Sequence, residues 1–179
     1  MITFLFALHF IKSQKQENLM PEISLLGWMH TIIAIIALVA GYYTLAVYKV
    51  ITLETKSGQL YLICTLIAAV TALMIYQHGA FGPAHALAVL TLLALIGGYL
   101  VTKIPALSKI KDYFQAFCFS GTLLFHMIPA ITDTLLRLPV NDPFLTNPED
   151  PLLKAFYLSF VAVFLLGYGL QFIWIKNRK

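Results

Sequence analysis

Long apolar runs separated by short polar connections dominate the chain. Five of these runs approach or exceed the roughly 20 mainly apolar residues that an α-helix needs to cross the hydrocarbon core of a bilayer. The pattern therefore predicts an all-α fold, a polytopic transmembrane helix bundle of about five spanning helices with no soluble domain. The bundle is expected to be one unit over residues 23–176, with helices over residues 23–48, 60–77, 83–101, 113–136 and 152–175.

Two segments interrupt this pattern. Residues 1–22 begin with an apolar stretch too short to span a bilayer, and we expect an interfacial or flexible N-terminal segment. A start at Met20 instead of Met1 is the alternative, and the absence of a basic start and of a small-residue cleavage site argues against a secretory signal peptide. Residues 137–151 are rich in Pro, Asn and acidic side chains, which predicts an exposed, extracytoplasmic loop.

Composition supports the membrane assignment. Hydrophobic residues make up 60% of the 179 residues and charged residues 11%, and the mean hydropathy is +0.83. A soluble domain carries about 25% charged residues because its surface faces water, whereas side chains that face lipid are apolar. The net charge of +4 comes from basic residues spread over short connections, so we predict the lipid bilayer, and no nucleic acid, as a partner.

The same basic residues predict the orientation. Side A is the end of the bundle that holds His30, the connection before Pro83 and the loop 137–151. Side B is the opposite end, and it carries eight cations: Lys49, Lys56, Lys103, Lys109, Lys111, Lys176, Arg178 and Lys179. Because Lys and Arg accumulate in cytoplasmic loops, side B is predicted to be cytoplasmic. The N-terminus then lies outside and the C-terminus inside, in a multi-pass protein of the inner cell membrane.

Four histidines carry the candidate chemistry. At a rise of 1.5 Å per residue, all four are expected in the half of the bundle nearest side A, on different helices: His30, His78, His85 and His126. The start of the third helix disfavours a charged His85, so the neutral imidazole that binds metals is favoured there. Imidazoles from facing helices ligate haem or transition metals. The pattern predicts a site for b-type haem or a metal such as copper.

Polar residues form a stripe along the fourth predicted helix. Their spacings of 3, 4, 4, 7 and 4 place them on one face: Gln115, Cys118, Thr122, His126, Asp133 and Arg137. Polar groups inside a membrane are expensive unless they face partners or water within the bundle. Thr122, Asp133 and Arg137 are the expected supporting residues around the histidines, although Asp133 and Arg137 are also spaced to pair with each other. Pro129 is expected to kink this helix beside His126.

The remaining features predict packing and no particular reaction. Cys64 and Cys118 are expected to be reduced and to pack as small apolar residues. Small residues at Ala34, Ala37 and Gly41 predict a close helix contact. The chain has no phosphate-binding loop and no His-Glu-x-x-His, Cys-x-x-Cys or Gly-x-Ser-x-Gly motif. The alternative to a cofactor site is therefore a non-catalytic accessory or assembly subunit, contacting other membrane subunits or a second copy, or a small-solute carrier that uses the polar stripe.

Two short segments resemble a bacterial membrane family. Gly58-Gln59-Leu60-Tyr61, followed by an apolar helix and the turn Phe81-Gly82-Pro83-Ala84-His85, is similar to the domain of unknown function 2306 family over about residues 27–100. The resemblance implies an early helix that opens with a histidine, matched by His30, and a Gly-Pro-x-His turn into a later helix. Glu54 stands where the family has a histidine, and residues 108–113 lack its later His-Arg segment. The resemblance implies no activity.

Overall fold

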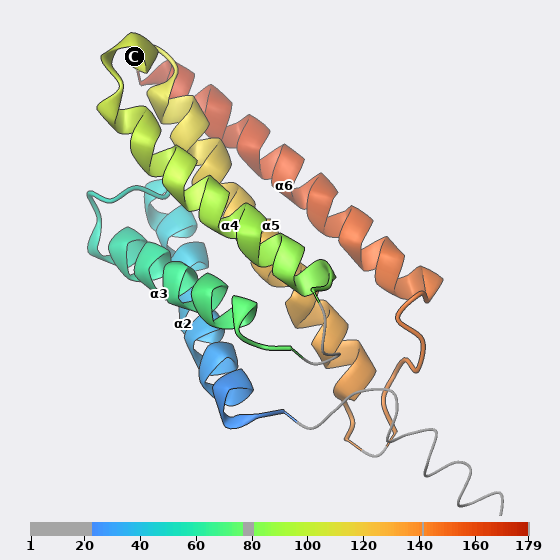
Figure 1. Cartoon of the computed structure of the whole chain (residues 1–179). Helices are drawn as coiled ribbons and strands as arrows, with labels where there is room; N and C mark the ends of the chain where they lie inside the picture. The colour runs from blue at the N-terminus through green and yellow to red at the C-terminus, as the bar shows by residue number, and fades with distance from the viewer. Residues whose placement is uncertain (1–22, 77–80, 141, 179) are drawn as a thin grey trace, which may run out of the picture.

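Five long helices form the part of the chain that the structure describes, which covers residues 23–76, 81–140 and 142–178 of a computed structural model (Figure 1). The helices are α2 (Leu25–Tyr48), α3 (Lys56–Leu73), α4 (Pro83–Leu100), α5 (Lys111–Arg137) and α6 (Pro151–Asn177). All five are long and apolar enough to cross a membrane. This confirms the prediction of an all-α protein with five candidate spans, and the arrangement is that of a multi-pass membrane protein.

Successive helices pack side by side and alternate in direction (Figure 1). The turn between α2 and α3 lies lower down the bundle in Figure 1 than the connection between α4 and α5, which contains the short 3-10 helices η1 (Val101–Lys103) and η2 (Pro105–Leu107). Helix α6 lies at one edge and packs along α5. The α2–α3 pair, α4 and α6 are therefore all arranged around α5.

Helix α3 begins earlier than the apolar pattern predicts, at Lys56 instead of residue 60. The side chain of Thr55 caps it by accepting the N–H of Gly58 at 3.1 Å, which satisfies one of the free donors of the first turn. A Cβ at Gly58 would lie 2.2 Å from the Thr52 carbonyl oxygen, so only glycine permits this tight entry into the helix. The helix ends at Leu73, four residues before the predicted boundary.

Helix α5 supplies much of the buried surface in the middle of the bundle. It runs without a break through Pro129, and its buried residues include Ala116, Phe119, Thr122 and Leu123. The least apolar of the five spans are α3 and α5, and they are also the two that are most buried within the protein. Polar side chains in the middle of these two helices, such as Thr65, Ser120 and Thr122, are buried within the bundle.

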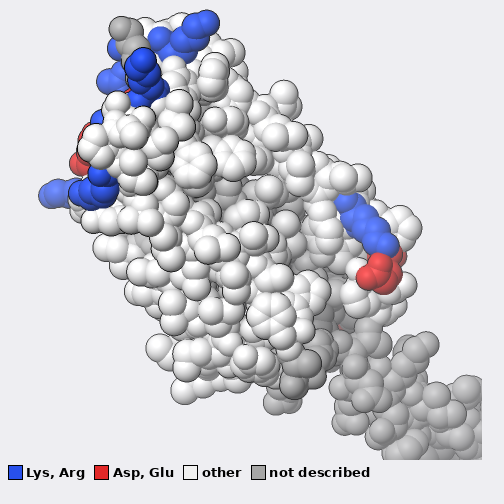
Figure 2. Space-filling view, turned by 45° about the horizontal axis from the view of Figure 1, so that its top comes forward, with Lys and Arg blue, Asp and Glu red and all other residues white. Residues whose placement is uncertain are grey.

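Positive charge is concentrated at one end of the bundle. Figure 2 shows Lys and Arg side chains gathered at the end that holds the C-terminal part of α6, which is side B. This distribution is the one on which the predicted orientation rests, and the direction in which the bundle crosses a membrane stays a prediction. The expectation for the N-terminal segment, residues 1–22, falls outside the described residues.

Candidate functional site

Helix α3 carries four hydroxyl groups that bond to its neighbours. Three of them follow at intervals of four residues, which aligns them along one side of a helix, and the full set is Ser57, Tyr61, Thr65 and Thr71. Each hydrogen bonds with a side chain of α2 or α5, and the partners, in the same order, are Thr44, Thr122, His126 and His30. These eight residues are named the α3 column. From first to last the hydroxyls cover about 21 Å of helix, most of the ~30 Å hydrocarbon core of a bilayer.

The end of the column nearest side B is a pair of hydroxyls. Thr44 Oγ1 lies 2.8 Å from Ser57 Oγ and 2.7 Å from the carbonyl oxygen of Ala40, one turn earlier in α2. Thr44 is fully buried. Because its hydroxyl is satisfied by these two partners, this pair ties the end of α2 to the start of α3 without an unpaired polar group.

Tyr61 occupies the middle of the column and has no exposed surface. Its hydroxyl hydrogen bonds with the hydroxyl of Thr122 and lies 3.3 Å from the carbonyl oxygen of Phe119, to which Thr122 also donates at 2.7 Å. The ring packs directly on Gly41 of α2, where a Cβ would lie 2.8 Å from the nearest ring carbon. A glycine at position 41 therefore brings α2 close enough to enclose the tyrosine.

Two histidines complete the column toward side A. His30 Nδ1 lies 3.1 Å from Thr71 Oγ1, and His126 Nε2 lies 3.2 Å from Thr65 Oγ1. The Thr71 hydroxyl donates its one proton within its own helix, to the Ile67 carbonyl at 2.9 Å or to the Ala68 carbonyl at 3.0 Å. His30 therefore donates from Nδ1, and in the neutral ring its Nε2 carries the lone pair.

The histidines also interact electrostatically beyond these hydrogen bonds. His30 lies close enough to both His126 and Asp133 for their charges to affect one another. Asp133 in turn accepts from Arg137 Nε at 3.2 Å, and its side chain is about half exposed near side A. Beyond the two histidines of the column, this ion pair lies near the surface at side A. The prediction that Asp133 and Arg137 pair with each other is confirmed.

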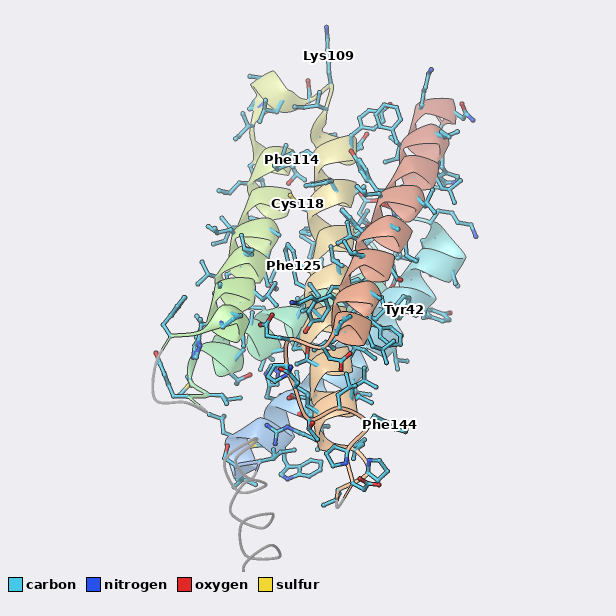
Figure 3. The ribbon with its side chains drawn as sticks, turned by 90° about the vertical axis from the view of Figure 1, so that its right-hand side faces the viewer. Tyr42, Lys109, Phe114, Cys118, Phe125 and Phe144 are labelled. Atoms are coloured by element: carbon cyan, nitrogen blue, oxygen red, sulfur yellow. The ribbon has the colours of Figure 1, made fainter. Side chains whose placement is uncertain are left out.

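The polar stripe of α5 divides between two neighbours. Thr122 and His126 bond to α3, as described above. Nearer side B, Gln115 donates to the carbonyl oxygen of Gly98 in α4 at 3.2 Å. Figure 3 shows Cys118 on the side of α5 that faces α4, and its thiol is buried and free. The stripe is therefore an inward face, as its spacing predicts, and only its middle belongs to the column.

His85 lies apart from the column, in the first turn of α4. Its Nδ1 accepts the backbone N–H of Gly82 at 3.2 Å, so the side chain caps the start of its own helix. The ring stacks against Phe81 and Tyr76, with centroid distances of 5.2 and 4.6 Å. Of the four predicted histidines, His30 and His126 are brought together by the fold, His85 has these separate contacts, and His78 lies outside the described residues.

The donor set fits a metal poorly. Among the described residues, no group of three or more His, Cys, Asp or Glu side chains is arranged to hold a metal ion. A ligating histidine usually donates from its second nitrogen. His30 satisfies that pattern, whereas the Nδ1 of His85 accepts a hydrogen bond. The Nε2 of His126 is bonded to the Thr65 hydroxyl, and either group can be the donor.

Two hollows lie outside the column. A cleft of about 540 Å³ at side B is lined by the α2–α3 connection, the start of α5 and the end of α6, and includes Glu54, Asp112, Gln115 and Trp174. A smaller groove of about 140 Å³ lies between α2, α5 and α6, beside the labelled Tyr42 in Figure 3. The cleft adjoins the α2–α3 turn and so lies near the Ser57 end of the column.

Sequence reasoning missed the α3 half of this site. It selected Thr122, His126 and His30 but none of their hydroxyl partners on α3. The available signal was the interval of four from Ser57 to Tyr61 and from Tyr61 to Thr65, in a helix less apolar than its neighbours.

Comparison of the chain with protein-family models, curated proteins and solved structures finds no match, so the resemblance to the domain of unknown function 2306 family stays a prediction.

Proposed function

We propose that this membrane protein is a small-solute carrier whose solute is the proton, and that protons pass along the α3 column. The observation that carries the proposal is the succession of three hydrogen-bonded pairs of hydroxyl and imidazole groups along the helix, Tyr61–Thr122, Thr65–His126 and Thr71–His30. Imidazole binds and releases protons near neutral pH, and hydroxyls both donate and accept hydrogen bonds. Ionisable residues within a membrane span are functional candidates by default, because burying them is costly.

Packing favours a proton over a larger solute. Four residues of the column have no exposed surface: Thr44, Tyr61, Thr65 and Thr122. Both hollows described above are lined by other residues. Neither hollow therefore offers a larger molecule a path along this part of the column. A proton needs only hydrogen-bonded partners, which the column supplies.

The gap between the two pairs nearest side B is the natural position for a gate. Tyr61 hydrogen bonds toward α5, and Ser57, one turn nearer side B, bonds to Thr44 of α2. One helical turn, about 5.4 Å, separates the two α3 residues. Proton passage to side B needs a water or a side-chain movement across this turn. Passage toward side A needs the same between the Thr65–His126 and Thr71–His30 pairs, because the hydrogen bonds of the described residues lie within each pair.

Liposomes test the proposal directly. The purified protein is reconstituted around a trapped pH-sensitive dye, and a membrane potential drives proton entry. We expect acidification well above that of empty liposomes, and we expect His126→Gln to return it to the empty-liposome rate because an amide keeps a hydrogen bond but does not titrate. Thr91→Val is the matched control, since the Thr91 hydroxyl is buried but bonds only to its own helix, at the Leu87 carbonyl.

The outcomes separate the proposal from interhelical adhesion. Wild-type protein that shows no flux above empty liposomes, while His126→Gln lowers its unfolding temperature, would identify the column as a structural contact in an accessory or assembly subunit. Equal flux in wild type and His126→Gln would also contradict the proposal. Folding of each variant is checked by thermal unfolding in detergent, so that loss of flux is not confused with loss of structure.

Haem b or copper remains the second candidate, supported by the pattern of His30, which donates from Nδ1 to Thr71 and keeps Nε2 for a ligand. The same preparation provides the test. A Soret band, or copper that co-purifies in stoichiometric amount and is lost in His30→Gln, would favour this function. A colourless protein that binds neither haem nor copper on titration leaves the proton pathway as the better explanation.

A further inference from the structure

The second nitrogen of His85 is the buried polar group that nothing above explains. The ring is 5% exposed, and its Nδ1 accepts the N–H of Gly82. A nitrogen that accepts a hydrogen bond carries no proton in the neutral ring, so Nε2 carries it. Nε2 is buried and has no hydrogen-bond partner among the described residues. Buried donors in folded proteins are nearly always paired, so this N–H points to an acceptor supplied from elsewhere.

Two exposed aromatic rings surround this donor. Tyr76 and Phe81 stack on the His85 ring and are themselves 58% and 64% exposed. Neither lies in a helix, so each can move aside without breaking helical hydrogen bonds. The group lies at the side A end of the α4 span, which is the depth at which aromatic side chains meet lipid headgroups.

We propose that His85, Tyr76 and Phe81 form a binding site for an amphipathic molecule of the side A leaflet, which presents a carbonyl oxygen to His85 Nε2–H. Such an oxygen is carried by a quinone ring and by the acyl ester of a glycerolipid. The aromatic rings cover the apolar part of the molecule next to the carbonyl. The site is independent of the α3 column, and it takes no metal at Nε2 because that nitrogen offers a proton in place of a lone pair.

Two substitutions at position 85 isolate the donor from the helix cap. Glutamine and glutamate at the third helical position both reach back to the backbone N–H of the capping residue, so both keep the contact with Gly82. His85→Gln also keeps an N–H donor, whereas ionised His85→Glu has none. We expect decylubiquinone or a retained diacyl lipid to bind wild type and His85→Gln, and to bind His85→Glu about tenfold more weakly, the effect of one such hydrogen bond.

Binding is measured on protein in nanodiscs by titration with decylubiquinone, and retained lipid is measured by native mass spectrometry. The side-chain ¹⁵N signal of His85 in wild-type protein reports the contact without any variant. Loss of decylubiquinone binding in His85→Glu identifies a quinone as the occupant, and loss of a retained lipid identifies the lipid ester. Equal binding to all three proteins, or a His85 signal that neither probe shifts, would overturn the proposal.

Discussion

Helices α3 and α6 are attached to α5 by different means. Helix α3 makes side-chain hydrogen bonds to α2 and α5 through Ser57, Tyr61, Thr65 and Thr71. Helix α6 is nine residues longer, yet much more of its surface faces outward. Its contacts with α5 include the aromatic pairs Tyr113–Phe172, Phe117–Phe164 and Phe117–Tyr168. Hydrogen bonds accompany them: Ser120 donates to Gln171 at 3.0 Å, the hydroxyls of Thr132 and Tyr157 lie 2.6 Å apart, and the Tyr168 hydroxyl donates to the Tyr113 carbonyl at 3.4 Å.

The difference shows what holds helices together where lipid replaces water. Apolar surface gains little from leaving lipid, so association depends on close packing and on interhelical hydrogen bonds. Helix α3 uses both, with Tyr61 packed on Gly41 and hydroxyls along its length. Helix α6 also has aromatic packing and hydrogen bonds, but these join it to a single neighbour, and most of its surface stays outside the bundle. The α2–α3–α5 contact is therefore expected to be the stable part of the bundle, and α6 the part that separates first.

Removing one large ring from each contact gives the largest expected effect. Tyr61→Ala deletes a fully buried ring and leaves Thr122 without its hydroxyl partner, and it should cost about 3–5 kcal/mol of unfolding free energy. Phe164→Ala deletes a half-buried ring from α6 and should cost clearly less. Unfolding in detergent with increasing sodium dodecyl sulfate measures both. A larger loss in Phe164→Ala would reverse the proposed order of stability.

Two glycine substitutions test the packing with the same chemical change. A Cβ at Gly41 would lie 2.8 Å from the Tyr61 ring and 2.9 Å from Leu123, so Gly41→Ala should destabilise the protein by about 1–3 kcal/mol through overpacking. Gly167 of α6 has no atom within 4 Å of such a Cβ. Gly167→Ala should therefore stabilise the helix by about 0.5–1 kcal/mol. If the two variants unfold at the same denaturant concentration, the proposed difference in packing between the α2–α3 contact and α6 is wrong.

A pair of double-mutant cycles compares the hydrogen bonds themselves. Tyr61→Phe combined with Thr122→Val reports the α3 contact, and Ser120→Ala combined with Gln171→Leu reports the α6 contact. Interhelical hydrogen bonds in membrane proteins contribute about 0.6 kcal/mol on average and up to about 1.7. We expect both coupling energies in this range, with the Tyr61 pair higher because Tyr61 and Thr122 have no exposed surface, whereas Ser120 and Gln171 keep a little. Zero coupling for Tyr61 and Thr122 would remove the hydrogen bond as the source of α3 stability.

The apolar runs predict the number and approximate positions of the helices because each span must satisfy its backbone hydrogen bonds internally. The spacing in α5 also predicts an inward polar face with Thr122 and His126. The partners on α3 are harder to predict, because a threonine hydroxyl in a membrane helix can bond to its own backbone. Thr71 does so and still accepts from His30, and nothing in the spacing of a single helix reveals the second contact.

The boundaries of α3 and the role of His85 are also hard to predict from spacing, because both depend on particular local contacts. The early start at Lys56 requires the Thr55 cap and the close approach of Gly58 to Thr52. His85 was predicted as a ligand from its place at a helix start, and that place is also what allows its Nδ1 to accept from Gly82. Helix rotation decides between such uses, and rotation follows from packing between segments distant in the chain.

The smallest expected effect concerns the surface at the start of α6. Lys154 Nζ lies 2.7 Å from Glu149 Oε2, and this hydrogen bond and the charge of Lys154 lower the pKa of the Glu149 carboxyl from its usual value of 4.5. A carboxyl whose pKa is lower in the folded state stabilises the fold above the unfolded-state value and loses that contribution as pH falls through the folded-state value. Glu149→Gln should therefore lower the unfolding temperature slightly near neutral pH, and this effect should shrink as pH falls below 4.5 and vanish below the folded-state pKa.

Thermal unfolding of wild type and Glu149→Gln over this pH range, at low and high salt, measures that difference. Because both side chains are exposed, salt should screen the pair. Gly167→Ala should keep its effect in salt and acid, since it acts through helix propensity. If Glu149→Gln instead destabilised the protein as much as Tyr61→Ala, the attachment of α6 would depend on charge at its start, and aromatic packing along α5 would no longer explain how that helix is held.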